Sequence, residues 1–226
     1  MNAQRETRTP RGRRRAATPQ APGGSPRSGS LASAPAASTP APSRPPRVLF
    51  VCTGNVCRSP FAEVALVHLL PDGLPTKERV GVASAGTTAM SRHPIAREMH
   101  APLTDRGWQA PQFRARQLDW EIMSNSDLVL TMTWEQRSRI IEDWPVFARR
   151  TGVLTGVPSL VVLGPPTAQT IAEWTRTLRA REVPDIPDPY RQSPEVATTA
   201  AALIEQHVRT LAGWLSPTPR LGRHRS

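Results

Sequence analysis

The segment Val48–Glu63, VLFVCTGNVCRSPFAE, constrains the fold of this chain more than any other stretch. Residues 47–51 are mostly apolar, with β-branched and aromatic side chains, and predict a buried strand. Ser59, followed by a proline, indicates the N-cap and first turn of a helix. Between them lie Gly54 and Asn55, residue types that tolerate the positive φ of a tight loop. The segment is therefore predicted to form a strand, a loop and a helix.

This arrangement predicts an anion site at the start of the helix, with a cysteine beneath the anion. Loop N–H groups converge on the helix N-terminus, whose partial positive charge attracts anions and lowers the pKa of a nearby cysteine. Cys52 would lie under the anion as a thiolate, with Ser59 offering it a hydroxyl. Arg58 can hold two phosphate oxygens at once, which a lysine cannot do. A cysteine at a strand end is commonly just a small buried residue, and an arginine at a helix start is commonly just solvated. The glycine and asparagine between them favour the functional interpretation.

A cysteine, five residues, an arginine and a serine after the first strand resemble the signature of the low-molecular-weight protein tyrosine phosphatase family. The resemblance implies that Cys52 attacks phosphorus while Arg58 and the loop amides hold the phosphoryl oxygens. It also implies that Ser59 steadies the thiolate and that Ser84 braces the loop asparagine. The residues lining the phosphate would be Thr53, Gly54, Asn55, Val56 and Cys57.

The same resemblance implies a general acid far along the chain. Asp188 lies in Pro184–Tyr190, PDIPDPY, whose three prolines favour an extended loop. Taken locally, this is an ordinary Asp-Pro turn. In the family, an Asp-Pro-Tyr motif at this place supplies the acid, so Asp188 would protonate the tyrosyl oxygen and later activate water. Asp185 is the weaker alternative because no Pro-Tyr follows it.

Other positions bear on support of the loop and on the substrate. Phe113 stands where many family members have a histidine in the bracing network, so support of the loop is expected to differ there. Tyr190 is interpreted as a ring-stacking wall or as a hinge aromatic, and Met90 as a slot residue or as core. Trp134 is expected to begin a helix. The depth of the family's slot implies that phosphotyrosine reaches Cys52 and the shorter phosphoserine does not.

Both cysteines of the chain, Cys52 and Cys57, lie in this loop. A disulfide-rich secreted scaffold or a zinc site would need further Cys or His residues, so a cytoplasmic protein without a metal or other cofactor is expected. Cys57 is interpreted either as an ordinary buried residue or, as in the family, as a thiol that captures oxidised Cys52 in a reversible disulfide. The second interpretation makes the activity redox-sensitive.

Positive charge is concentrated at the two ends of the chain. Residues 1–46 contain nine prolines and eight arginines against one glutamate, a net +7. This composition cannot bury enough apolar surface to offset chain entropy, so a disordered tail is predicted there and at 216–226, which holds three more arginines. Of the total of +11, only +1 belongs to residues 47–215. The tail is interpreted as a solubilising segment or as a docking segment for an anionic partner, and no run reaches the ~18 apolar residues of a membrane helix.

Residues 47–215 alternate between strand and helix patterns, which predicts an α/β domain with a parallel sheet covered on both faces. The resemblance spans these residues and implies four parallel strands flanked by helices, with the anion site at the carboxyl end of the first strand. Further strands are expected at 80–84, 127–132 and 152–155, and helices at 59–70, 94–106, 134–143, 167–181 and 194–215.

These residues together predict hydrolysis of protein phosphotyrosine through a phosphocysteine intermediate. A sister group in the family acts on phosphoarginine; there a threonine replaces Val56 and the acid motif tends to end in phenylalanine rather than Tyr190. Arsenate reductases share the loop, but the thioredoxin-coupled kind needs two further cysteines downstream, which this chain lacks. A non-catalytic anion-binding module is a further alternative, disfavoured by the presence of Cys52, Arg58 and Asp188.

Overall fold

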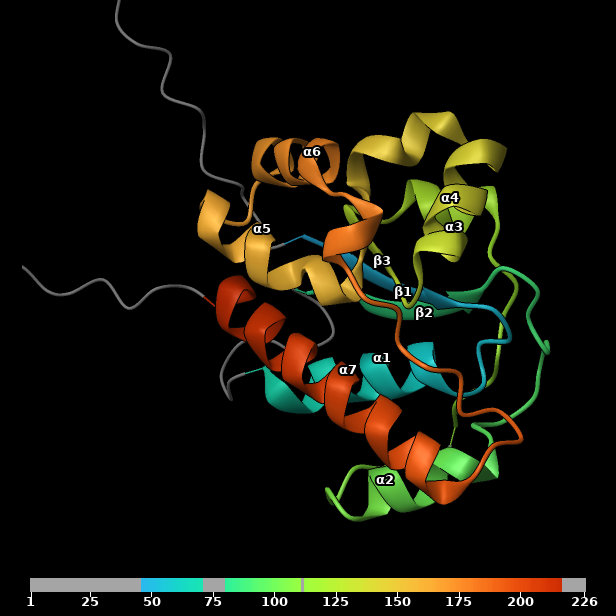
Figure 1. Cartoon of the computed structure of the whole chain (residues 1–226). Coiled ribbons are helices and arrows are strands. Elements are labelled where there is room, and N and C mark those ends of the chain that lie inside the picture. Colours follow the sequence, from blue (N-terminus) through green and yellow to red (C-terminus); the bar gives the residue numbers. More distant parts are fainter. Residues whose placement is uncertain (1–45, 71–79, 111, 217–226) are drawn as a thin grey trace, which may run out of the picture. The chain divides into compact units, whose positions relative to one another are not determined.

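The computed structural model describes residues 46–70, 80–110 and 112–216. They form a four-stranded, all-parallel sheet with helices on both faces (Figure 1), as predicted. The predicted tails lie outside the described residues, apart from Pro46 and Ser216. The strands are β1 (Val48–Cys52), β2 (Val82–Gly86), β3 (Leu128–Thr131) and β4 (Thr151–Val153). The α-helices are α1 (Arg58–Leu69), α2 (His100–Thr104), α3 (Trp120–Ser124), α4 (Trp134–Asp143), α5 (Val157–Leu163), α6 (Ala168–Thr177) and α7 (Pro194–Leu215), and the 3-10 helices are η1 (Arg97–Met99), η2 (Pro145–Arg150), η3 (Leu154–Gly156) and η4 (Ala180–Glu182).

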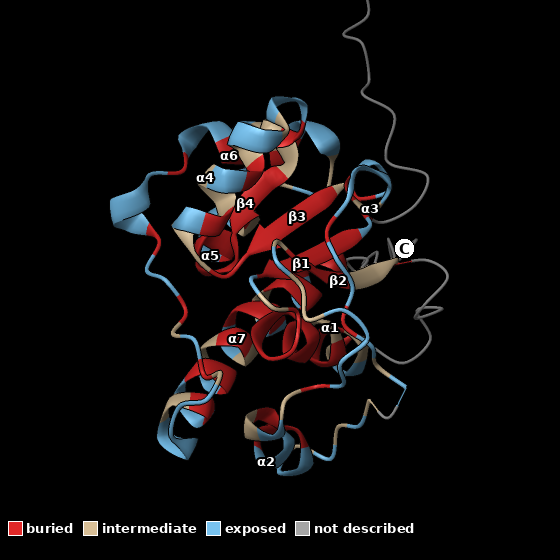
Figure 2. Cartoon of the chain, turned by 90° about the vertical axis from the view of Figure 1, so that its right-hand side faces the viewer, coloured by how far each residue is buried: buried red, intermediate tan, exposed pale blue. Residues whose placement is uncertain are grey.

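β1 is buried along its whole length because it has a strand on each side and helices over both faces. The strand order is β2-β1-β3-β4. Val48, Phe50 and Cys52 belong to the apolar cluster that includes α1 and α7, whereas Leu49 and Val51 belong to a second cluster that includes α3 and α4. Figure 2 shows β1, β3 and β4 in red and the start of β2 in tan, with exposed outer surfaces on the surrounding helices. Burial on both faces explains the uninterrupted apolar run of the sequence.

The register of the sheet brings the ends of β1 and β2 together, with Cys52 opposite Gly86. A Cβ atom on Gly86 would lie 2.5 Å from the carbonyl oxygen of Thr53 and 3.0 Å from the Cβ of Asn55. Glycine therefore allows the loop after β1 to rest directly on the end of β2. The carboxyl end of the strands in an open parallel sheet is also where ligands bind.

The predicted helix at 94–106 starts later and is shorter: residues 94–96 are not helical, and η1 leads directly into the short α2. Ala96 has extended backbone angles, and its N–H donates to the carbonyl oxygen of Val56 at 2.8 Å. A long-range bond to the loop after β1 has taken the place of a helical one, which local spacing cannot reveal. α3 and α5 are two further helices that the sequence patterns did not predict.

α7 spans the 22 residues expected for the last helix. Its apolar face packs against α1 and α5, and Figure 1 shows it crossing beneath the sheet beside α1. The opposite face carries exposed polar side chains, as expected for an amphipathic surface helix. None of the helices in the described residues combines the length and the apolar character needed to cross a membrane.

His207 makes the stability of this packing sensitive to pH. It lies on the buried face of α7, 9% exposed, and its Nδ1 has no hydrogen-bond partner in the described residues. Burial lowers the pKa of its imidazole below the ordinary 6.5. Because the unfolded chain then binds the proton more readily, stability is expected to fall as the pH drops through 6.5.

Urea denaturation at pH 7.5 and 5.5 tests this expectation. His207→Leu removes the titrating group and should flatten the pH dependence, whereas His93→Gln, at an exposed histidine, should leave it unchanged. An unaltered pH slope in His207→Leu would show that another group is responsible.

Candidate active site

Cys52 lies at the end of β1, where its sulfur forms the floor of the loop 53–57. The residue is 2% exposed. The backbone N–H of Asn55 donates to the sulfur at 3.3 Å, and the Ser59 hydroxyl lies 3.0 Å from it. Asn55 has a φ of 53°, in the left-handed region that an asparagine tolerates. The loop is thus wrapped around the sulfur rather than extended away from it.

α1 begins at Arg58, one residue before the predicted start, and Cys57 rather than Ser59 is its N-cap. No side chain caps this end of the helix. The Ser59 hydroxyl instead lies inside the first turn, where it accepts a hydrogen bond from the Asn55 side chain at 2.9 Å and contacts the Cys52 sulfur. The first N–H groups of α1 therefore face the loop without a side-chain cap and can receive an anion.

The side chain of Asn55 is held at both ends. Its Nδ2 donates to the hydroxyls of Ser59 and Ser84, each at 2.9 Å. Its Oδ1 accepts from the backbone N–H of Arg116, also at 2.9 Å. These contacts leave one orientation for the amide and fix the turn that surrounds the sulfur.

Glu63 sets the direction of this hydrogen-bond chain. A carboxylate only accepts, so the Ser84 hydroxyl must donate its hydrogen to Glu63 Oε2, at 2.6 Å. The Ser84 oxygen is then left to accept from Asn55. Ser59 likewise accepts from Asn55, so its own hydrogen is directed to the Cys52 sulfur at 3.0 Å or to the carbonyl oxygen of Ala85 at 3.4 Å, and the sulfur is the nearer of the two. The chain therefore presents a hydroxyl donor to the sulfur.

Phe113 takes no part in this brace and packs against the larger apolar cluster. The support expected to be different there comes instead from Glu63 and the backbone of Arg116. Neither residue is among the predicted site residues. Glu63 could have been found from its position, because four residues after Ser59 it shares a face of α1 with that serine. Arg116 could not, since its contribution is a backbone group.

Arg58 is 4% exposed and lies beside the loop. Its Nη1 donates to the carbonyl oxygen of Ile186 at 3.2 Å, and its Nη2 forms an ion pair with Asp188 at 2.5 Å. Its Nε has no partner in the described residues. Because buried donors are nearly always paired, this N–H marks a place for an acceptor from outside the described chain.

The structure distinguishes the two candidate acids in the loop after α6. The Asp188 side chain is 51% exposed and pairs with Arg58. Asp185 Oδ1 instead accepts from the backbone N–H of Trp134 at 2.7 Å, at the start of α4. Asp188 therefore faces the candidate site, and Asp185 stabilises a helix end.

A glutamine outside the predicted set ties the loop to the next strand. Gln136, in the first turn of α4, accepts from the N–H groups of Met132 and Thr133. Its amide nitrogen donates to the Thr53 hydroxyl at 3.1 Å. The loop is thus anchored to the β3–α4 connection as well as to β2.

Cys57 is a free thiol, 2% exposed, in the same loop. Burial raises the pKa of this thiol far above its ordinary value, and the negative charges of Cys52, Asp188 and Glu98 raise it further against the opposing effect of Arg58. Cys57 therefore remains protonated.

A groove of about 430 Å³ opens beside the loop. The predicted wall residues Met90 and Tyr190 both line it, together with Val56 from the loop. Met90 is fixed there by its backbone N–H, which donates to the carbonyl oxygen of Gly54 at 2.9 Å. Trp134 is not among the lining residues; Arg137 stacks over its ring at 4.6 Å.

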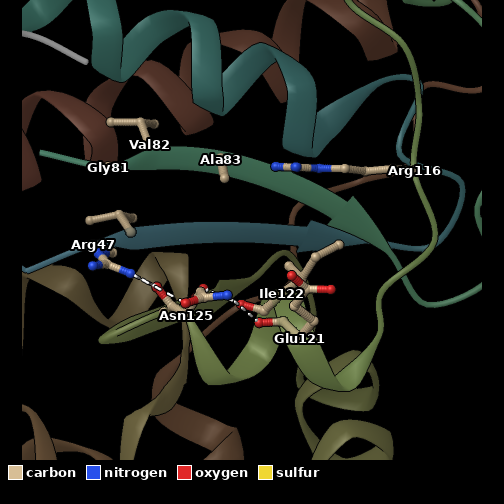
Figure 3. A pocket seen from close by; sticks show the side chains of 10 residues that line it. Arg47, Gly81, Val82, Ala83, Arg116, Glu121, Ile122 and Asn125 are labelled. Carbon is tan, nitrogen blue, oxygen red and sulfur yellow. Dashed lines mark hydrogen bonds between the residues drawn. The ribbon is translucent and has the colours of Figure 1, made fainter. Parts of the chain in front are cut away.

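A second cavity, of about 290 Å³, lies between β2 and α3 (Figure 3). Arg47 at one side donates to Asn125 at 3.3 and 3.4 Å, and Arg116 extends along β2, where its Nε donates to the carbonyl oxygen of Ser84. This cavity therefore touches the brace of the loop but not the sulfur. Within 46–70, 80–110 and 112–216, no group of three or more His, Cys, Asp and Glu side chains could hold a metal ion.

Comparisons with known proteins agree with this geometry. Residues 47–155 match the model of the low molecular weight phosphotyrosine protein phosphatase family. The probable low molecular weight protein-tyrosine-phosphatase EpsP of Ralstonia nicotianae is 30% identical over 161 residues, which are 71% of this chain and 90% of that protein. The match to the family model ends before Asp188, whereas the similarity to EpsP covers more of the chain.

Solved structures have the same fold. The YwlE arginine phosphatase from Geobacillus stearothermophilus has a TM-score of 0.59 at 28% identity, covering 75% of this chain and 92% of that one. The tyrosine phosphatase Wzb from Escherichia coli K30 has a TM-score of 0.57 at 24% identity, and the match covers 75% of this chain and 97% of Wzb. At this identity the match supports only the assignment of the fold. The chain belongs to the low molecular weight phosphotyrosine protein phosphatase family.

Proposed function

We propose that this protein hydrolyses phosphotyrosine in proteins through a phosphocysteine intermediate. The observation that carries the proposal is the buried Arg58 guanidinium beside the loop that surrounds the Cys52 sulfur. Its Nε–H lacks a partner in the described residues. Two guanidinium N–H groups and the loop amides match the oxygens of a phosphate. A cysteine beneath such a cradle is positioned to attack phosphorus.

In the first step, the Cys52 thiolate forms a bond to phosphorus as the bond from phosphorus to the phenolic oxygen breaks. The Asp188 carboxyl donates its proton to that oxygen, so the leaving group departs as neutral tyrosine. Arg58 and the loop amides hold the remaining phosphoryl oxygens while charge moves between them. The Ser59 hydroxyl stabilises the sulfur as an anion.

In the second step, water attacks phosphorus and the bond to sulfur breaks. Asp188, now a carboxylate, takes the proton from the water, and Cys52 leaves as a thiolate. The products are inorganic phosphate and the enzyme in its starting form. Both steps therefore use the same residues, with Asp188 as the acid in the first step and as the base in the second.

Arg58 and Asp188 must exchange partners during this cycle. In the free enzyme they form an ion pair. An incoming phosphate competes for Arg58 Nη2 and also takes the vacant Nε–H. Asp188 then loses its cationic partner and faces the negative charge of the phosphate, which disfavours a second negative charge beside it. Substrate binding itself thus favours the acid that the first step requires.

Phosphotyrosine is the substrate that the site supports best. Cys52 lies at the floor of a loop and is almost fully covered, so a long, flat side chain is needed to bring phosphorus to it. Tyr190 and Met90 line the adjoining groove and can contact an aromatic ring. Phosphoarginine is the second candidate, because the YwlE arginine phosphatase resembles this chain at 28% identity. Val56 and Tyr190 favour tyrosine, since the arginine-specific group has a threonine and tends to have a phenylalanine there.

Turnover of matched peptides containing phosphotyrosine, phosphoarginine or phosphoserine tests the assignment. We expect kcat/KM for phosphotyrosine to exceed that for phosphoserine by at least about 10²-fold, a difference of nearly 3 kcal/mol in transition-state binding. A higher kcat/KM for phosphoarginine than for phosphotyrosine would mean that the protein is an arginine phosphatase. No turnover of any of the three would contradict a phosphatase function.

Three further assignments accompany this proposal. The cytoplasm is the proposed location, because both cysteines are free thiols. Cys57 is proposed to react with the sulfenic acid of an oxidised Cys52, forming a disulfide and releasing water. Its raised pKa makes the attacking thiolate scarce, so this capture should be slow. The basic segment 1–46 is proposed as a docking segment for an anionic partner.

A further inference from the structure

The groove beside the loop continues away from the sulfur, toward η1 and the start of α2. Val56, Met90 and Tyr190 line its end at the candidate active site. Ile95, Arg97 and Arg191 line its continuation. A substrate whose phosphate rests in the loop would therefore bring the residues next to its phosphotyrosine over this groove.

The continuation of the groove is basic. Arg97 and Arg191 are exposed, and neither guanidinium lies within ion-pair distance of a carboxylate in the described part of the chain. His93 and His100 are exposed in the same lining. The lining contains one carboxylate, Glu98. With two arginines against one carboxylate, the lining of the groove carries a net positive charge.

The backbone of Arg191 is fixed by its neighbours, and its exposed guanidinium lies over an aromatic ring. Its φ of 57° is left-handed, a conformation that a residue with a long side chain rarely adopts. Glu98 Oε1 accepts from its backbone N–H at 3.2 Å, and its guanidinium carbon lies 5.1 Å from the centre of the Tyr190 ring. The glutamate is therefore used to position the backbone of Arg191. A guanidinium restrained in this way loses less entropy when it binds a ligand.

We propose that this groove binds an acidic residue of the substrate, adjacent to its phosphotyrosine, and that Arg97 and Arg191 select for it. The inference rests on the proposed phosphotyrosine phosphatase function. The occupant is an extended acidic peptide because charge complementarity requires carboxylates, and because the groove begins at the residues that line the candidate active site. Apolar Ile95 and Met90 would contact the stem of such a side chain.

The expected preference is moderate because both arginines are exposed. An exposed ion pair strengthens binding by about two- to five-fold, so two such pairs would give roughly four- to twenty-fold. Salt should reduce this preference, since screening acts over about 8 Å at physiological ionic strength. A preference of this kind alters kcat/KM for peptides without altering the chemistry at Cys52.

Steady-state kinetics of the full chain on three substrates tests the proposal: p-nitrophenyl phosphate, a phosphotyrosine peptide flanked by aspartates, and the same peptide flanked by alanines. The variant Arg97→Gln/Arg191→Asn removes both charges, and asparagine tolerates the left-handed backbone at 191. Arg176→Gln is the matched control, because Arg176 is exposed on α6, across the sheet from α2 (Figure 1).

We expect the wild type to favour the aspartate peptide by about four- to twenty-fold at low salt, and much less at high salt. The double variant should lose this preference while retaining its rate on p-nitrophenyl phosphate, and Arg176→Gln should behave as the wild type. A wild type with no preference, or a preference that survives in the double variant, would overturn the inference while leaving the phosphatase function intact. Absence of activity on all three substrates would instead refute the proposed function.

Discussion

Replacing Cys52 by serine is expected to lower turnover of phosphotyrosine by at least about 10⁴-fold, because the nucleophile itself is removed. A serine hydroxyl is not ionised near neutral pH. Within the part of the chain that the structure describes, the Cys52 sulfur has hydrogen bonds with the N–H of Asn55 and the hydroxyl of Ser59, which can stabilise an anion but are not bases for a hydroxyl proton. Steady-state kinetics with a phosphotyrosine peptide measures the loss.

The loss should be confined to chemistry. Cys52→Ser leaves Arg58 and the loop amides in place, so stabilisation of the protein by inorganic phosphate in a thermal melt should persist. Cys57→Ser is the matched control, because Cys57 lies in the same loop, is equally buried and remains protonated. It should keep most of the wild-type turnover. Substantial turnover by Cys52→Ser, or a comparable loss in Cys57→Ser, would contradict the assignment of the nucleophile.

The central part of this site could be predicted because its chemistry is local. Cys52, Arg58 and Ser59 lie within eight residues, on a strand end and a helix start whose geometry is fixed by a short loop. The spacing alone therefore places them around one anion site. Asp188 lies 130 residues from Arg58, and only resemblance to the family pointed to it. No local pattern distinguishes its Asp-Pro turn from that of an ordinary loop.

The contacts that hold the loop could not be predicted, because they are long-range and partly made by backbone groups. Gln136 reaches Thr53 from α4, and Arg116 supports Asn55 through its N–H. The same limit explains why the helix predicted at 94–106 begins only at Arg97. The N–H of Ala96 donates a hydrogen bond to the loop after β1 instead of to the preceding turn. The spacing of apolar residues cannot predict such a long-range bond.

Replacing Asp188 by asparagine is expected to lower kcat for phosphotyrosine by about 10²- to 10³-fold, the usual contribution of a general acid. The size of the loss should depend on the leaving group. Tyrosine needs a proton as it departs, whereas p-nitrophenolate is stable as an anion. The rate of the first step should therefore fall far less with p-nitrophenyl phosphate than with phosphotyrosine. Comparing kcat for the two substrates, with single-turnover measurements of the first step, checks this dependence.

Asp185→Asn is the control that makes the leaving-group test specific. Asp185 lies three residues earlier in the same loop, but its carboxylate binds the N–H of Trp134 at the start of α4. Its loss should lower stability without distinguishing the two substrates. Asp188→Asn also frees Arg58 Nη2 from its ion pair, so inhibition by phosphate should be retained or strengthened even as kcat falls. Equal losses on both substrates, or weaker phosphate inhibition, would mean that Asp188 positions Arg58 instead of transferring a proton.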